Sequence, residues 1–481
     1  MSQTQTTIPK IIHQLWIGKK PRPSKFMQTW QDKHPDYEYI MWNEAEIVNR
    51  GLKLHCQKRI DEIEEINGKA DIIRWEILYK YGGLFLDADS ICIEPFYKLM
   101  DKNRAFVGYE NENVRPGLVA TGTMAFAPAH PLCRGAINWI LANNVSRQTT
   151  GQMAWQTVGP GLLTKMLETK LYPDVEILPS YFFLPVHCTG ITYAGHAKVY
   201  EFQLWGSTKQ CYDNMNAMDL PSQFLPPTEW VSVLVSSYNT KQAYVKECLE
   251  SIRRQNGYFG IEIVWINDGS DMLSTTLLER TLKDFETTTR FIKVIYKKWD
   301  KNMGIGYSLN EGVLLCRNEI IIKVDSDDIL LDDRIIKQLN FMKATPDCVI
   351  CGTNAHYLKT ITGPNGTRTG ISGQTNHPFL LTWESYKNNL NPSHWFVNHP
   401  CVCYKKSAIL AVGNYNKATH SLYEDFELEL KLLKHFGKLY NIQENLLYYR
   451  IHDDQVTANG ACAKPEINKL REEFIREMIK N

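Results

Sequence analysis

Apolar residues first fall at helical spacing and then form a short run in residues 69–89. Residues 72, 73, 77, 78 and 81 predict a helix, and a Gly82-Gly83 pair follows them. Glycine readily adopts the left-handed conformation that ends a helix. Leu84-Phe85-Leu86 then predicts a short buried strand, with Asp87 and Asp89 at its carboxyl end. Because side chains alternate along a strand, both carboxylates are expected on the same side.

Strand and helix patterns alternate through the rest of the chain. In the first half, residues 8–18, 37–42, 106–109 and 121–127 predict strands. Residues 221–229 contain three prolines, which favour extended chain over packed structure. After them, strand patterns at 231–235, 261–266, 291–296 and 319–324 are separated by helical patterns, which is typical of βαβ units and a mainly parallel sheet. We therefore predict two α/β domains, residues 1–222 and 230–481, joined by a linker at 223–229.

A second acidic cluster follows a strand pattern in the second half. Residues 320–324 are largely apolar and lead into Asp325-Ser326-Asp327-Asp328. In open α/β sheets, ligands bind beyond the carboxyl ends of the strands. Paired carboxylates there suit a hard divalent cation that holds a diphosphate, so we expect Mn²⁺ or Mg²⁺, one ion per domain. An isolated Asp-x-Asp is often a solvated turn, but here Asp71 and Arg74 share a face of the preceding helix.

Charge and composition narrow the class of protein. The 481 residues include 54 Lys and Arg against 53 Asp and Glu, so a nucleic-acid partner is not expected. The twelve cysteines lack the paired spacing of zinc sites and are interpreted as reduced thiols. The N-terminus has no apolar leader, and no run approaches the roughly 18 apolar residues of a membrane span. We expect a cytoplasmic protein with no transmembrane segment.

The first half resembles glycosyltransferase family 32 over about residues 8–210. The resemblance rests on Ile8-Pro9-Lys10-Ile11-Ile12-His13-Gln14-Leu15-Trp16 and on the stretch from Lys69 to Asp89, and it extends to the donor-binding core of the glucosylating clostridial toxins. It implies a GT-A-like domain that retains the anomeric configuration. Trp16 would line the base, Asp87 would bind the nucleotide sugar and Asp89 the metal, while Asp71 and Arg74 would hold sugar hydroxyls and diphosphate. The alternative for Trp16 is an ordinary core residue.

One position departs from this family. Many members carry a histidine near the position of Gln203, and that histidine completes the metal shell. Gln203 is a weaker, neutral oxygen ligand, and His196 is the nearest histidine that could replace it. The first half therefore lacks the histidine that completes the metal shell in those members of the family.

The second half resembles glycosyltransferase family 2 over about residues 229–460. Five segments carry the resemblance in order: residues 231–239, Asn267 to Ser270, Asn302-Met303-Gly304 with Asn310-Glu311-Gly312, Asp325 to Asp328, and Glu424-Asp425. The family implies a GT-A-like domain that inverts the anomeric configuration. Its nucleotide-sugar pocket would contain Tyr238 near the uracil ring, Asp268 on the base or ribose, and also Asn239, Asn302, Gly304 and Asp325.

The same resemblance assigns the chemistry of the second site. Asp327 would bind the metal, and His452 would be a further ligand. Asp425 would act as the general base that takes the proton of the acceptor hydroxyl. A structural alternative exists for Asp425, because a carboxylate at a helix N-terminus is favoured by the helix dipole. For His452 the alternative is an ordinary structural histidine.

Together these observations predict a bifunctional, metal-dependent glycosyltransferase. Its donors would be UDP- or GDP-sugars and its acceptor a glycan or glycoconjugate. The alternative is that only the C-terminal half transfers sugar, while the N-terminal half is a nucleotide-sugar or glycan-binding module. A nucleotidyltransferase would need a glycine-rich basic loop near the first strand, and neither half has one.

Overall fold

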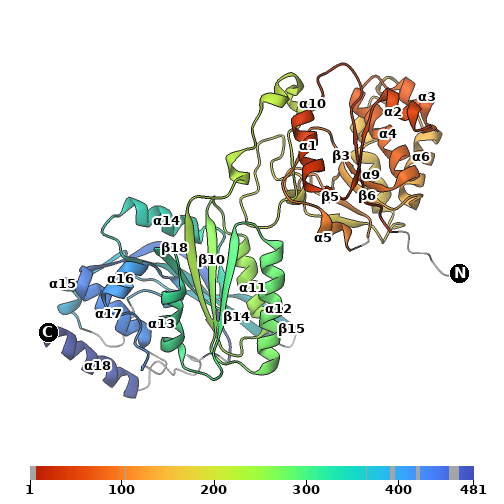
Figure 1. Cartoon of the computed structure of the whole chain (residues 1–481). Helices are drawn as coiled ribbons and strands as arrows, with labels where there is room; N and C mark the ends of the chain where they lie inside the picture. The colour runs from red at the N-terminus through yellow and green to blue at the C-terminus, as the bar shows by residue number, and fades with distance from the viewer. Residues whose placement is uncertain are drawn as a thin grey trace. The chain divides into compact units, whose positions relative to one another are not determined.

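The computed structural model describes residues 7–102, 104–363, 366–390, 396–418, 423–453, 455 and 465–480, without the side chains of 223, 360–363 and 366–368. The chain forms two compact units (Figure 1). Unit 1 comprises Met1–Tyr193 and Lys198–Phe224, and unit 2 comprises Ala194–Ala197 and Leu225–Asn481. Both units are α/β, as the alternating patterns predict.

Unit 1 contains a six-stranded mixed sheet in the order β2-β1-β3-β6-β5-β7. Strands β2, β1 and β3 are parallel, whereas β6 runs antiparallel to both β3 and β5. A separate antiparallel pair, β4 and β8, lies outside this sheet. The strands are β1 (Ile11–Leu15), β2 (Glu38–Trp42), β3 (Gly83–Leu86), β4 (Ser90–Cys92), β5 (Phe106–Tyr109), β6 (Val119–Phe126), β7 (Glu176–Leu178) and β8 (Glu201–Gln203).

Helices cover both faces of the unit 1 sheet. The larger core lies between the sheet and helices α4, α6 and α9 (Figure 1), and a second cluster packs α1 and α5 on the other face. The helices are α1 (Ser24–Lys33), α2 (Glu44–Asn49), α3 (Gln57–Glu62), α4 (Ile66–Tyr81), α5 (Tyr97–Met100), α6 (Pro131–Ala142), α7 (Arg147–Thr150), α8 (Ala154–Thr157), α9 (Pro160–Glu168) and α10 (Gly206–Lys209).

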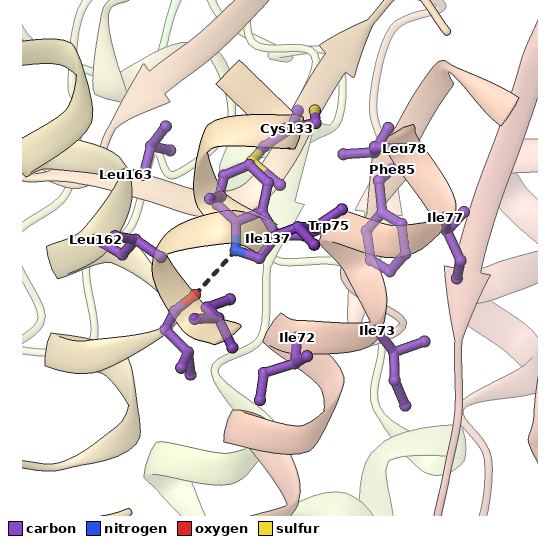
Figure 2. Packing of buried hydrophobic residues seen from close by; sticks show 14 of the residues in the cluster. Ile72, Ile73, Trp75, Ile77, Leu78, Phe85, Cys133, Ile137, Leu162 and Leu163 are labelled. Atoms are coloured by element: carbon purple, nitrogen blue, oxygen red, sulfur yellow. Dashed lines mark hydrogen bonds between the residues drawn. The ribbon is translucent and has the colours of Figure 1, made fainter. Parts of the chain in front are cut away.

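Helix α4 is the centre of this core. Trp75 is fully buried between α4, α6 and α9, and its indole Nε1 donates a hydrogen bond of 2.9 Å to the carbonyl of Val158 (Figure 2). The helix ends at Tyr81, and Gly82 and Gly83 both have positive φ angles, 64° and 89°. The predicted helix, glycine stop and buried strand are therefore all present. Together they set the positions of Asp71 and Arg74 on the helix and of Asp87 after the strand.

Unit 2 contains a ten-stranded sheet whose main path is β11-β10-β9-β12-β17-β14-β18-β13. The four strands from β11 to β12 are parallel, as predicted, but β17 runs antiparallel to β12 and makes the sheet mixed. The strands are β9 (Trp230–Ser237), β10 (Gly260–Asn267), β11 (Ile292–Lys298), β12 (Ile320–Asp325), β13 (Ile329–Leu330), β14 (Ile350–Gly363), β15 (Gly366–Gln374), β16 (Leu380–Thr382), β17 (Cys403–Lys405) and β18 (Lys438–Ile451).

Two apolar clusters cover the faces of the unit 2 sheet. One packs α11, α12 and α14, and the other packs α13, α16, α17 and α18. Figure 1 shows α11 and α12 on one side of β9 and β10, with α13 on the other. The helices are α11 (Gln242–Arg253), α12 (Met272–Thr288), α13 (Ile305–Leu315), α14 (Arg334–Ala344), α15 (Trp383–Lys387), α16 (Lys406–Ala411), α17 (Glu424–Phe436) and α18 (Pro465–Lys480).

Two of the compositional expectations bear on the described residues. The eleven cysteines among them are free thiols, and nine of these are buried. None of the helices in the described ranges combines the length and the apolar character needed to cross a membrane.

Candidate active sites

In unit 1, Asp87 and Asp89 meet on the side chain of Gln203. Strand β3 ends at Leu86, so both aspartates lie in the turn between β3 and β4 and not on the strand itself. Gln203 on β8 donates from its Nε2 to Asp89 Oδ1 at 2.8 Å and to Asp87 Oδ2 at 3.3 Å. The expectation that strand alternation aligns the carboxylates was wrong in its cause. The turn and the β4–β8 pair bring them together.

Arg74 is the cation of this site. Its Nη2 pairs with Asp87 Oδ1 at 2.5 Å, and its Nη1 lies 3.3 Å from Asp71 Oδ1 and also donates to the Thr121 carbonyl. The guanidinium carbon lies 4.7 Å from the centre of the Phe85 ring. Asp71 and Arg74, the pair predicted on α4, thus point to the acidic turn, and Arg74 holds the side chain of Asp87 in place.

Burial raises the pKa of two carboxyls at this site. Asp71 and Asp89 are almost fully buried, and loss of hydration raises the pKa of each to about 6. Arg74 opposes this increase at Asp71, whereas the nearby charge of Asp87 adds to it at Asp89. A site that concentrates carboxylates so closely is prepared for a positive charge.

Several residues at this site were not predicted from the sequence. Glu201, two residues before Gln203 on β8, is buried and accepts a hydrogen bond from Thr123, and burial raises its pKa well above the usual value. Gln14 on β1 donates to the Asp87 carbonyl at 3.0 Å and accepts from Tyr39 at 2.7 Å. In the sequence, only Gln14 gave a signal for such a role, because it lies inside the Ile8–Trp16 segment that carries the family resemblance.

Trp16 lies at the end of β1 and is partly exposed. Its indole Nε1 donates to the Lys20 carbonyl at 2.9 Å, and its ring meets Tyr212 edge-on at 5.1 Å. Tyr212 packs against Gly206, whose amide donates to Asp89 Oδ2 at 2.6 Å. An aromatic pair therefore borders the acidic turn.

His196 does not replace the missing histidine of the first site. It belongs to unit 2, where its amide donates to the Arg253 carbonyl at 2.7 Å and its ring lies 5.2 Å from that of Phe259. Gln203 is the residue beside the aspartates. Its Oε1 is buried and accepts no hydrogen bond from any described residue, so an unused oxygen lies on the same side chain that contacts both carboxylates.

In unit 2, Asp325 is the last residue of β12 and Asp327 follows it in a turn. Asp327 Oδ2 lies 2.8 Å from His452 Nε2, although 125 residues separate them in the chain. Asp325 pairs with Lys323, whose side chain is only 1% exposed. The two residues predicted as metal ligands, Asp327 and His452, are therefore in contact, and Lys323 is an additional charged group that the motif did not predict.

Arg450 supports this turn from inside the protein. Its amide donates to Asp328 Oδ1 at 2.8 Å, and its Nε donates to the Asp327 carbonyl at 2.8 Å. Its guanidinium also pairs with Glu247 and lies over the Tyr244 ring at 4.3 Å. Asp328 Oδ2, by contrast, is buried and finds no hydrogen-bond donor within the described part of the chain.

The predicted nucleotide side lies at the carboxyl ends of β9 and β10. Tyr238 is 53% exposed, and Asn239 has a φ of 52° and is held by contacts with Ser270 and Asp271. Asp268 is buried, and its two oxygens accept the amides of Met303 and Gly304 at 2.8 and 3.0 Å. Asn302 is exposed beside them. Asp268 thus fixes the loop that carries Asn302 and Gly304.

Asp425 is the second residue of α17. Its Oδ1 accepts the amide of Phe426 at 2.7 Å. Burial raises the pKa of its carboxyl above the usual value, and this hydrogen bond and the positive charges of Arg471 and Lys323 offset only part of that increase. Lys323 therefore influences both Asp325 and Asp425, the residues predicted for the donor sugar and for the base.

A divalent metal fits the oxygen-rich character of both sites, although neither has a complete shell of charged ligands. Over the ranges that the structure covers, no group of three or more His, Cys, Asp or Glu side chains is arranged to hold a metal ion. Unit 1 offers two carboxylates and the unused Gln203 oxygen, and unit 2 offers Asp327 and His452 beside the unused Asp328 oxygen. A cation would satisfy these acceptors.

Comparison with known proteins identifies the class of protein to which this chain belongs. Residues 232–413 match the family described as glycosyl transferase family 2, and residues 21–106 match the glycosyltransferase sugar-binding region containing a DXD motif. An uncharacterized glycosyltransferase of Haemophilus influenzae is 31% identical over 246 residues, which are 50% of this chain and 84% of that protein. The chain belongs to the glycosyltransferases. Its two units are GT-A-like domains in tandem, as the two resemblances imply.

Other relatives of this glycosyltransferase are similar over part of the chain. The UDP-Gal:alpha-D-GlcNAc-diphosphoundecaprenol beta-1,3-galactosyltransferase of Escherichia coli is 28% identical, over 50% of this chain and 82% of that protein. Among solved structures, S. aureus TarS 1-349 in complex with UDP has 17% identity and a TM-score of 0.39. That alignment covers 52% of this glycosyltransferase and 65% of the TarS chain.

Proposed function

We propose that this chain is a bifunctional, metal-dependent glycosyltransferase that uses UDP- or GDP-sugars as donors and a glycan or glycoconjugate as acceptor. The N-terminal domain would retain the anomeric configuration and the C-terminal domain would invert it. The observation that carries the proposal is the repetition of one arrangement. In each unit, acidic residues lie at the carboxyl end of a central strand and contact one residue that is distant in the sequence: Gln203 at the end of β8, or His452 just after β18.

The second site supports an inverting transfer. Asp425 would take the proton of the acceptor hydroxyl while that oxygen forms a bond to the anomeric carbon of the donor sugar. The bond from the anomeric carbon to the phosphate oxygen breaks at the same time, and the electron pair leaves with the nucleoside diphosphate. Exposed Tyr238 would stack on the base, and Asp325 would accept hydrogen bonds from the ribose or sugar. The name of the E. coli relative contains a UDP-sugar donor, which supports the same donor class here.

Asp327 and His452 would hold the metal of the second site, and Asp89 with Asp87 and Gln203 would hold that of the first. When bound, the cation neutralises the charge that accumulates on the leaving diphosphate. The protein's own contribution is to fix these ligands before the donor arrives. Arg450 holds the Asp327 backbone, and the Gly206 amide holds Asp89.

For the first site we propose a retaining transfer. Such a transfer needs no separate base on the opposite face of the donor sugar. The phosphate oxygen of the leaving group can accept the acceptor's proton on the same face. Asp71 and Arg74 would orient the donor sugar and diphosphate. The aromatic pair of Trp16 and Tyr212 would border the base.

Single-residue variants of the full chain test this assignment. We expect Asp87→Asn to remove one sugar transfer, and Asp327→Asn and Asp425→Asn to remove the other, each by at least about 100-fold. Transfer would be measured with a panel of UDP- and GDP-sugars, Mn²⁺ and mixed glycan acceptors. Asp284→Asn is the matched control, since this aspartate is 71% exposed on α12 and belongs to neither site. If Asp327→Asn and Asp425→Asn leave both transfers intact, the assignment of the second site is wrong.

A second candidate follows from Gln203. Its amide occupies both carboxylates of the first site, which favours an N-terminal module that binds a nucleotide sugar or glycan without transferring it. In that case Asp87→Asn would change no catalysed transfer and would only weaken binding of a UDP-sugar, measured by calorimetry. The loss of a distinct transfer in Asp87→Asn would exclude the module.

A further inference from the structure

Two buried cations of unit 2 lie near Asp425. Lys323 on β12 and Arg471 on α18 are each only 1% exposed. The guanidinium carbon of Arg471 lies 5.2 Å from the ring centre of Phe426, the residue after Asp425. Removing a cation from water costs several kcal/mol unless nearby negative charge compensates it. Each of these side chains therefore requires an acidic neighbour.

Asp425 is an acidic group that both cations influence. The charges of Arg471 and Lys323 favour its ionised form, against the effect of burial. Asp325 also pairs with Lys323, at the predicted donor side of the site. Lys323 thus links the donor carboxylate to the predicted base, and Arg471 approaches the same base from a helix that contains none of the family motifs.

Burial also disfavours the charged forms of two groups near Asp425, Glu429 and Tyr415. Glu429 follows one turn later on α17, and burial, with the charge of Asp425, raises its pKa well above the usual value. Tyr415, from the loop after α16, hydrogen-bonds to His399 at 2.7 Å and to Tyr404 at 3.0 Å, and burial raises its pKa well above 10. The adjacent Glu424 is also buried. Lys323 and Arg471 are the two positive charges that favour the ionised form of Asp425 in these buried surroundings.

We propose that Lys323 and Arg471 are positioning residues that hold Asp425 as a carboxylate at the second site, and that α18 is thereby part of the transferase machinery. The inference rests on the proposed role of Asp425 as base. Arg471 and Lys323 do not touch the reacting atoms. They act by keeping Asp425 able to accept the proton of the acceptor hydroxyl.

The pH dependence of turnover distinguishes this role from a structural one. We would measure kcat/KM for release of UDP or GDP from a panel of UDP- and GDP-hexoses with Mn²⁺, in the full chain carrying Asp87→Asn. In Lys323→Met and Arg471→Met, the acidic limb of the pH profile of kcat/KM should move to higher pH by about one unit. The reason is that each variant removes a positive charge that favours ionised Asp425. Arg471→Lys should restore most of the original limb. A structural role would lower turnover equally at every pH.

Lys434→Met is the matched control. Lys434 on α17 donates to the Met478 carbonyl of α18 at 2.7 Å, so the variant disturbs the same helix pair without removing a charge that acts on Asp425. Its limb should match that of the parent. An unmoved limb in both Lys323→Met and Arg471→Met would overturn the inference.

Two further measurements keep the outcomes separate. If Asp425→Asn retains turnover with the parent's limb, the proposed base is wrong. If Asp425→Asn removes turnover while the Met variants leave the limb in place, only the inference fails. If a Met variant does not fold, Arg471→Gln is used as the test variant. In that variant, ¹³C NMR of labelled aspartate measures the titration of Asp425 directly. The Asp425 signal is identified by its loss in Asp425→Asn, and an unshifted titration in Arg471→Gln contradicts the inference.

Discussion

At the scale of single residues, the acidic site of unit 1 costs stability. Asp71 is nearly fully buried, and its folded pKa of about 6 exceeds the usual 3.8, mainly because burial disfavours the charged form. Above pH 6 the folded protein must keep a carboxylate that the unfolded chain would hydrate better. The penalty grows from about pH 4 to pH 6 and then stays constant.

We therefore expect Asp71→Asn to stabilise unit 1 at pH 7.5 while it impairs donor binding. The shift in pKa, which already includes the attraction to Arg74, corresponds to at most about 3 kcal/mol. The measurement is thermal unfolding of the full chain from pH 4 to 8. The advantage of the variant should shrink steadily as the pH falls from 6 to 4, because Asp71 becomes protonated in the folded state first and in both states only below about pH 3.8. An advantage that is independent of pH would show that ionisation of Asp71 is not its cause.

At the scale of elements, the β1–β3 pairing sets the position of the acidic turn. Gly83 begins β3 with a φ of 89°, and a Cβ there would lie 2.7 Å from the carbonyl oxygen of Ile11 on β1. Gly51 in the same unit also has a positive φ, 57°, but nothing lies within 4 Å of a Cβ at that position. Substituting alanine at Gly51 would introduce backbone strain alone, whereas alanine at Gly83 would add a steric contact to that strain.

Gly83→Ala should destabilise unit 1 by several kcal/mol and weaken binding of a UDP-sugar, because β3 must move away from β1. Gly51→Ala should cost only about 1 kcal/mol, the price of the left-handed backbone. Urea unfolding of the full chain gives both values, and calorimetry gives donor binding. Equal losses in the two variants would mean that the contact with Ile11 does not constrain β3.

Local sequence patterns predicted the elements that contain the motifs. The composition of each site depends instead on contacts between residues that are far apart in the sequence. Helix α4 and strand β3 follow from apolar spacing and two glycines, all within about 20 residues. The partners Asp89 and Gln203 are 114 residues apart, and Asp327 and His452 are 125 apart. Strand β8 has three residues and no strong pattern of its own. A single sequence does not contain the information that places such a strand beside β4.

At the scale of the whole molecule, the division into units does not follow the chain strictly. The segment Ala194–Ala197 precedes the proline-rich linker but belongs to unit 2. His196 donates its amide to the Arg253 carbonyl at 2.7 Å, and its carbonyl accepts the Arg290 amide at 2.8 Å. Ala197 forms an isolated antiparallel bridge with Thr289. A residue of the first half should therefore control the stability of the second unit.

His196→Pro tests this dependence, because proline has no amide hydrogen to donate to Arg253. In calorimetry of the full chain we expect one transition to fall by a few degrees, corresponding to about 1–2 kcal/mol. It should be the transition that Gly83→Ala leaves unchanged, since Gly83 belongs to unit 1. His196→Ala keeps the backbone bonds and loses the imidazole, with its contact to the Phe259 ring and its hydrogen bond to the Arg290 backbone, so its transition should lie between those of the parent and His196→Pro. If His196→Pro lowers the transition assigned to unit 1, the segment does not support unit 2 in solution.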